Sequence, residues 1–99
     1  MVKLTALYKK PGDPQEFDRY YKEVHTPLAN KMPGLKKLEV AKVLGSPGGE
    51  CEYHLVANLY FDNMDALKSA MGSEEGKAAA RDVKNFANGL VQMIICEVQ

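Results

Sequence analysis

The chain has 99 residues, 45% of them hydrophobic, and its 13 basic side chains are balanced by 13 acidic ones. This length indicates one domain, which we expect over residues 1–99. The balanced charge, without a basic run rich in aromatic residues, argues against binding to nucleic acid or to an anionic membrane. No apolar run is long enough to span a membrane.

The N-terminus and the cysteines predict the compartment. The first eight residues alternate in polarity and are too short for a signal peptide. Cys51 and Cys96 match no metal-ligand spacing and fall in apolar runs, so we expect buried thiols rather than metal ligands. These features together predict a soluble protein of the cytoplasm.

Residues 2–8 alternate as a strand does, and residues 9–12 form a turn before the longest helix-periodic segment, residues 17–35. Asp13 is the expected N-cap, with Pro14 at the first helical position and Glu16 completing a capping box. The apolar side chains of the segment recur at spacings of three and four, which predicts one buried stripe. The stripe consists of Phe17, Tyr20, Tyr21, Val24, Leu28 and Met32.

Pro27 interrupts this helix because it lacks a backbone donor and clashes with the carbonyl of Glu23, four residues earlier. Either the helix kinks, or it stops near His25 and restarts with Thr26 as a cap. Both alternatives place His25 at an irregular point of the backbone. The histidine is then either a residue that ties down the helix break or a pocket residue that moves a proton near neutral pH.

Two further strands are predicted at residues 36–44 and 51–61, joined by a glycine-rich loop over residues 45–49. The second strand alternates clearly. One face should pack on helices and consists of Cys51, Tyr53, Leu55, Ala57, Leu59 and Phe61. The other face suits a half-wet cleft or a subunit interface and consists of Glu52, His54, Val56, Asn58 and Tyr60.

A short helix is predicted over residues 62–71, capped by Asp62 or Asn63, with its apolar residues facing inward: Met64, Leu67 and Met71. A second helix begins after the Ser73 cap and continues to Phe86. Its expected buried residues are Ala79, Ala80, Val83 and Phe86. The final strand, residues 90–98, is apolar on both faces and therefore needs cover on both.

The order strand, helix, strand, strand, helix, strand predicts an α+β fold of the ferredoxin-like βαββαβ plan. Its four-stranded antiparallel sheet carries helices on one face. The other face would expose more apolar surface than a monomer usually does, so we expect a homodimer that pairs the open sheet faces.

Several stretches resemble the EthD family, named for ethyl tert-butyl ether degradation, within the dimeric α+β barrels. They are V-K-L-T-A-L-Y, F-D-R-Y-Y-K-E-V-H-T-P-L-A, P-G-L, Y-F-D-N-M-D-A-L and G-S-E-E-G-K-A-A-A-R-D-V-K-N-F. The H-T-P-L piece is the most specific. EthD-like proteins accompany a cytochrome-type oxidation system, and similar barrels act as isomerases of small lactones, as monooxygenases, and as dehydratases or cyclases. The family's helix histidine matches His25, which the resemblance implies borders a pocket between helices and sheet.

Two functions are compatible with these features. The first is a cofactor-free enzyme in which His25 is the general acid or base for a small apolar or aromatic substrate. Residues expected to contact the substrate are Tyr8, Tyr21, Leu28, Met32, Tyr53, His54 and Tyr60. The second is a non-catalytic binding or accessory protein for a partner oxygenase. No metal, flavin or nicotinamide motif is present, so we expect no cofactor. Opposing effects of a helix C-terminus and of burial predict that His25 titrates near neutrality.

Overall fold

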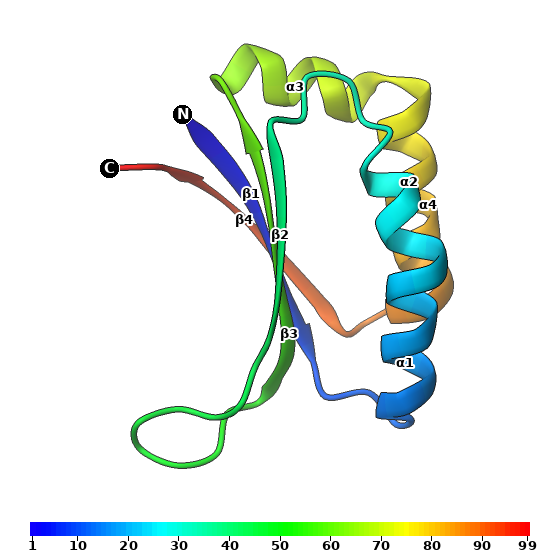
Figure 1. Ribbon diagram of the computed structural model, residues 1–99, viewed down its shortest axis with the longest axis vertical. Coiled ribbons are helices and arrows are strands. Elements are labelled where there is room, and N and C mark those ends of the chain that lie inside the picture. The colour runs from blue at the N-terminus through cyan, green and yellow to red at the C-terminus, as the bar shows by residue number, and fades with distance from the viewer.

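The computed structural model describes residues 1–99 and shows a twisted sheet with all helices along one face (Figure 1). The strands are β1 (Val2–Lys9), β2 (Lys37–Lys42), β3 (Tyr53–Phe61) and β4 (Val91–Glu97). All pairings are antiparallel, in the order β2-β3-β1-β4. This is the predicted ferredoxin-like α+β plan.

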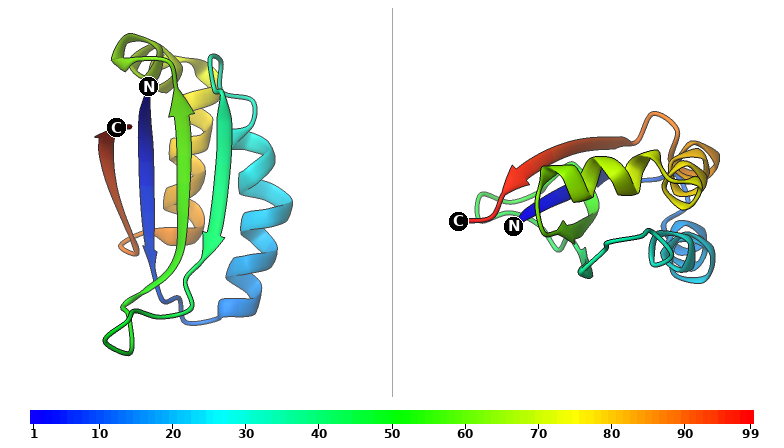
Figure 2. Two further views of the ribbon diagram at one scale, coloured as in Figure 1. Left: turned by 60° about the vertical axis from the view of Figure 1, so that its left-hand side comes forward. Right: turned by 90° about the horizontal axis from the view of Figure 1, so that it is seen from above.

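The helices are α1 (Pro14–Tyr20), the π-helical turn η1 (Tyr21–His25), α2 (Thr26–Ala29), α3 (Met64–Gly72) and α4 (Glu74–Ala87). In Figure 2 the continuous α1–η1–α2 helix and α4 run side by side behind the sheet. The predicted caps are present: Asp13 accepts a hydrogen bond from the Glu16 amide, Asn63 from Ala66 and Ser73 from Gly76. No helix has the length and hydropathy that crossing a membrane requires.

The helix break expected at Pro27 is instead a π-helical turn. The backbone stays right-handed helical from Tyr20 through Thr26, and the Thr26 amide donates to the Tyr21 carbonyl, five residues back. Thr26 therefore caps nothing, and the helix neither kinks sharply nor restarts. A proline already removes one ordinary helical bond, and the wider turn accommodates its ring without ending the helix.

A β-bulge reverses two predicted orientations in β3. Tyr8 pairs with Leu55, but the next residue of β1, Lys9, pairs with Tyr53, so His54 is an extra residue on β3. His54 therefore lies on the helix side, with its ring 5.4 Å from that of Phe17. The hydroxyl of Tyr53 donates instead to Gln92, on the open face. Alternation holds from Leu55 onward, as predicted.

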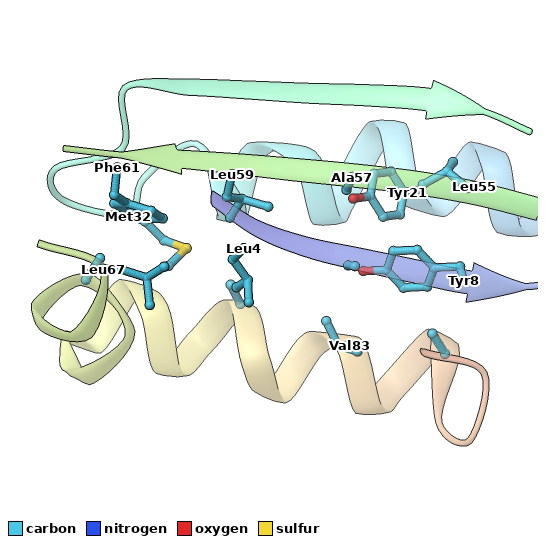
Figure 3. Packing of buried hydrophobic residues seen from close by; sticks show 14 of the residues in the cluster. Leu4, Tyr8, Tyr21, Met32, Leu55, Ala57, Leu59, Phe61, Leu67 and Val83 are labelled. Carbon is cyan, nitrogen blue, oxygen red and sulfur yellow. The ribbon is translucent and has the colours of Figure 1, made fainter. Parts of the chain in front are cut away.

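The hydrophobic core fills the space between the helix side of the sheet and the helices (Figure 3). Tyr8, Phe61 and Leu67 are its largest fully buried side chains. Met64 and Met71 of α3 are 37% and 41% exposed, contrary to prediction. The short helix α3 crosses the end of the sheet (Figure 1), and it buries Leu67, as predicted, together with Ala70.

Gly76 explains how closely α3 and α4 approach each other. A Cβ atom at this position would lie 2.1 Å from the carbonyl oxygen of Ala70 and 2.9 Å from Cα of Met71. Only glycine fits such a close approach of backbones. The α3–α4 corner is therefore tightly fixed, which in turn fixes where α4 lies on the sheet.

The last strand, β4, is an edge strand and is not covered on both faces in a single chain. Met93, Ile94 and Ile95 are 41%, 41% and 51% exposed. Ile94 pairs with Thr5 on the open face, whereas Met93 and Ile95 lie on the helix side. Cys96, and likewise Cys51, is a free thiol that is half-buried rather than buried as predicted.

Candidate functional site

A small apolar cavity lies between the helices and the sheet, with a volume of about 60 Å³. Side chains from β1, β3, η1, α2 and α4 line it, and among the lining residues are Tyr8, Tyr21, His25 and Met32. Its exposed lining residues, Met71, Ala80 and Met93, mark the mouth. Ala80 was expected to be buried, but it lies at this opening.

The charged element of the site is a buried histidine–carboxylate pair. Nδ1 of His25 lies 2.9 Å from Oδ2 of Asp82 on α4, and both side chains are only 7% exposed. The imidazole ring packs against Phe86 and Tyr21, with centroid distances of 4.9 Å and 5.1 Å. These contacts fix the ring plane as well as its position.

Asp82 determines which nitrogen of His25 carries the proton. A carboxylate accepts, so Nδ1 of the neutral ring is the protonated nitrogen and Nε2 holds the free electron pair. His25 makes no further hydrogen bond. No side-chain nitrogen or oxygen is fully buried without a partner, so Nε2 keeps some accessible surface, and the ring is part of the cavity wall.

Burial sets the protonation state of His25. It lowers the pKa of the imidazole below its ordinary value of 6.5, and the Asp82 carboxylate opposes this effect only in part. The titration is thus displaced to the acid side of the neutrality that the sequence led us to expect. At pH 7 the ring is neutral and Nε2 is a free base.

Two buried tyrosines supply hydrogen-bond donors beside this base. Their rings meet edge to face at 5.5 Å, and both hydroxyls point along the sheet toward Leu4 and Leu59 (Figure 3). Burial raises the pKa of Tyr21 to about 12, and burial together with the neighbouring Tyr21 raises that of Tyr8 further. Both hydroxyls therefore remain protonated donors at any physiological pH.

The other residues expected to contact a substrate lie away from this cavity. Leu28 is half-buried on α2 and does not line it. Tyr53 lies on the open sheet face, and so does Tyr60, whose hydroxyl donates to Glu39. The cavity thus brings together Tyr8, Tyr21, Met32 and His25 from the predicted set.

His54 belongs to a second histidine–carboxylate pair outside the cavity. Its Nε2 lies 2.7 Å from Oδ1 of Asp18, and Nζ of Lys42 donates to Oδ2 of the same carboxylate at 3.3 Å. The Asp18 side chain is 35% exposed. Nowhere do three or more His, Cys, Asp or Glu side chains gather as metal ligands would.

Asp82 is the functional candidate that the sequence reasoning missed. The predicted buried face of α4 consists of Ala79, Ala80, Val83 and Phe86 and does not include the adjacent aspartate. The available signal was its position, since Asp82 follows Ala79 by three residues and so borders the buried stripe. A charged residue at that border is almost never fully buried unless it is paired.

The fold and the cavity identify the class of the protein. It is a ferredoxin-like α+β domain with a histidine between the helices and the sheet. A Bacteroides fragilis structure, described as a dimeric protein of unknown function with a ferredoxin-like fold, superposes with a TM-score of 0.69 at 22% identity. The match covers 98% of this chain and 95% of that one. At such identity the likeness shows the fold alone.

Closer relatives then define the family. The EthD domain model matches residues 9–89. An ethyl tert-butyl ether degradation (EthD) family protein from Bacillus halodurans is 42% identical, with a TM-score of 0.97 over 100% of this chain and 99% of that one. An uncharacterized 11.0 kDa protein of the thcB-thcC intergenic region in Rhodococcus erythropolis is 35% identical over 97 residues, 98% of this chain and 94% of that protein. The chain belongs to the EthD family, as its resemblance predicted.

Proposed function

We propose that the protein is a cofactor-free acid–base catalyst that acts on a small apolar or aromatic molecule carrying a carbonyl or hydroxyl oxygen. The observation that carries the proposal is the buried His25–Asp82 pair at the wall of an apolar cavity. A histidine with a low pKa, held in one tautomer and facing a cavity, has the geometry of a general base.

In this mechanism Nε2 of His25 removes a proton from the substrate. Asp82 keeps Nδ1 protonated beforehand and stabilises the imidazolium that forms. The proton leaves an electron pair on the substrate, and negative charge develops on its oxygen. The protonated hydroxyls of Tyr21 and Tyr8 line the same cavity and are suited to donate to that oxygen. His25 can later return the proton to another atom of the substrate.

The dimensions of the cavity limit the ligand. A cavity of about 150 Å³ admits benzene, so the 60 Å³ present here would hold only part of an aromatic ring. The remainder would extend through the mouth between Met71 and Met93, because unbranched methionine side chains rearrange readily. Ligands should therefore be small, with their oxygen inside and an apolar part at the mouth.

The first experiment is a thermal-shift screen of small lactones, phenols and ethers. A ligand present at 100 times its dissociation constant stabilises the fold by about 2.7 kcal/mol, which a melting curve detects easily. Compounds that bind are then tested for turnover, or for exchange of an acidic proton with deuterated water. Binding of many compounds without any turnover or exchange would favour the accessory role beside a partner oxygenase.

The decisive variant is His25→Gln, which keeps a hydrogen-bonding side chain but cannot titrate. We expect it to fold and bind ligand while turnover falls by about a hundredfold or more, as loss of a general base requires. Circular dichroism and the thermal-shift assay check folding and binding. An unchanged turnover number in the folded variant would remove His25 from the mechanism.

We further infer that two copies pair through the open sheet faces. Ile94 is exposed there, next to a polar network in which Thr5 donates to Asn58, and Asn58 and Tyr60 donate to Glu39. A face with mixed polar and apolar groups is typical of subunit interfaces. The Bacteroides fragilis neighbour is described as dimeric, which supports a dimer for this chain.

Light scattering on a gel-filtration column tests the dimer and should give about twice 11.0 kDa. The register assigns Ile94, and not Ile95, to the open face. Ile94→Lys should therefore weaken the dimer, since it places a charge in the interface, whereas Ile95→Lys on the helix side should affect it less. A monomer at micromolar concentration would contradict the inference.

A further inference from the structure

Both oxygens of the Asp82 carboxylate are engaged, and they bind different residues. Oδ2 lies 2.9 Å from Nδ1 of His25, and Oδ1 accepts a hydrogen bond from the hydroxyl of Tyr20 at 2.5 Å. The Asp82 side chain is only 7% exposed, so little solvent shares its charge. Tyr20 and His25 therefore share one buried negative charge, and each is bonded to a different oxygen of the carboxylate.

The π-helical turn is what allows both residues to reach Asp82. Five residues along a regular α-helix turn by about 500°, which would leave Tyr20 and His25 about 140° apart around the axis. A π-helical turn forms its bonds between residues five apart and so brings such residues toward one face. The turn η1 covers Tyr21–His25, directly between the two contacts with Asp82.

Tyr20 contacts the carboxylate without entering the cavity. It is absent from the cavity wall and lines a separate surface groove, together with Asn85 and Phe86. The bond to Asp82 raises the pKa of Tyr20, so its hydroxyl remains a donor. A ligand in the cavity would meet His25, and Tyr20 could act on the reaction only through Asp82.

We propose that Tyr20 is a positioning residue whose hydroxyl holds Oδ1 of the Asp82 carboxylate and withdraws part of the negative charge of that group from the imidazole. A hydrogen bond to an ionised group is short and strong, and it concentrates that group's charge on the bonded oxygen. Less charge then faces Nδ1, which keeps the ring neutral and Nε2 available as a base. The role of Tyr20 in a reaction rests on the proposed function, whereas its effect on the protonation of His25 does not.

The test is the pKa of His25 in Tyr20→Phe, measured by nuclear magnetic resonance. The ionisable groups near the ring are Asp82 from α4, Tyr20 and Tyr21 from the same helix, and Tyr8 from β1. Removal of the Tyr20 hydroxyl leaves the carboxylate charge to His25 alone, so we expect the pKa of His25 to rise by about 0.5 or more. His54, the other histidine of the chain, serves as an internal reference in the same spectra.

A matched control is Thr5→Val, which removes another short hydroxyl bond, to Asn58 at 2.6 Å, far from the pair. It should leave the pKa of His25 unchanged. In an Asp82→Asn background, Tyr20→Phe should also have no effect, because the connecting charge is gone. If Tyr20→Phe is less stable than the parent protein, the titration is made without ligand at a lower temperature at which the variant is folded.

An unchanged or lowered pKa of His25 in folded Tyr20→Phe would overturn the proposal, as would a rise that persists in the Asp82→Asn background. These outcomes do not depend on any substrate. If the proposed function holds, the acid limb of the pH–rate profile in Tyr20→Phe should move upward together with the pKa of His25. A rise of the pKa without any detectable turnover would retain the positioning effect and count only against the proposed function.

Discussion

The chain contains the same residue pair twice, and the two copies differ in their surroundings. His25 and Asp82 are each 7% exposed, His25 lines the apolar cavity, and Tyr20 is the additional partner of the Asp82 carboxylate. His54 is similarly buried, but its partner Asp18 is 35% exposed and also binds Lys42. The chemistry of a histidine–carboxylate pair therefore follows from what surrounds the carboxylate.

The pKa directions express this difference. At His25, burial dominates and lowers the pKa of the imidazole. At Asp18, partial burial acts to raise the pKa, but the bonds from His54 and Lys42 outweigh it and hold the pKa below its ordinary value of 3.8. The first pair keeps its histidine neutral, whereas the second keeps its aspartate ionised. Only the first resembles a catalytic pair, and the second fastens α1 to β2 and β3.

The largest expected difference concerns the two aspartates. Asp82→Asn should lower turnover by about 10²- to 10⁴-fold, because the amide can donate to Nδ1 and so place the proton on the wrong nitrogen of His25. Asp18→Asn changes the other pair in the same way, at a distance from the cavity, and should lower turnover no more than a few-fold. Steady-state rates of both variants with a substrate from the screen test this. Equal losses would end the functional distinction between the pairs.

A smaller contrast is expected in stability. His25→Ala leaves the Asp82 carboxylate buried with only Tyr20 as a partner, and breaking a buried pair in this way costs about 3–5 kcal/mol of unfolding free energy. His54→Ala leaves Asp18 in contact with solvent and Lys42, so loss of that pair should cost about 1 kcal/mol or less, apart from lost packing of the ring. Urea denaturation measures both. The Asp82→Ala variant should partly rescue His25→Ala, because it removes the stranded charge.

The smallest effect is in the pH dependence of stability, where the pairs should act in different ranges. The pKa of the His25 imidazole is lower in the folded state than in the unfolded chain. As the pH drops, the unfolded chain therefore binds this proton at a higher pH than the folded protein does, and stability falls between pH 6.5 and the folded pKa. The pKa of Asp18 is also lower in the folded state, so its contribution is present above 3.8 and is lost below it. Melting temperatures from pH 7.5 to 3 test this, and His25→Gln should remove only the first decline.

Those parts of the fold that depend on local sequence patterns were predicted from the sequence. Strand alternation from Leu55 to Phe61, the caps at Asp13 and Ser73, and the order of the elements were all readable, because each depends on local periodicity or a local hydrogen bond. The resemblance to the EthD family was confirmed by the match over residues 9–89. His25 was singled out because it lies two residues before Pro27, at the expected irregularity of the helix, and it does line the cavity.

The departures from prediction all involve a change of register or a distant neighbour. The bulge at His54 changes the side-chain orientations at and before it, and the π turn at Tyr21–His25 changes those that follow it. A shift of one residue leaves no periodic signal. The burial of Asp82 depends on Tyr20 and His25, which are 62 and 57 residues away in the chain. Met64 and Met71 have the right spacing for burial, but the direction in which α3 crosses the sheet decides which of its residues are covered.

The π turn also has a consequence at the level of the gene. Such a turn holds one residue more than an α-helical turn would, so in coding terms it corresponds to a single additional codon. Removal of that codon would close the helix with regular bonds and leave Tyr20 and the histidine four residues apart, about 40° around the axis. Both side chains would still lie on one face of the helix, so we expect the shared carboxylate to keep its two partners. The turn is thus a place where the helix can lose three nucleotides in frame and still present both residues to Asp82.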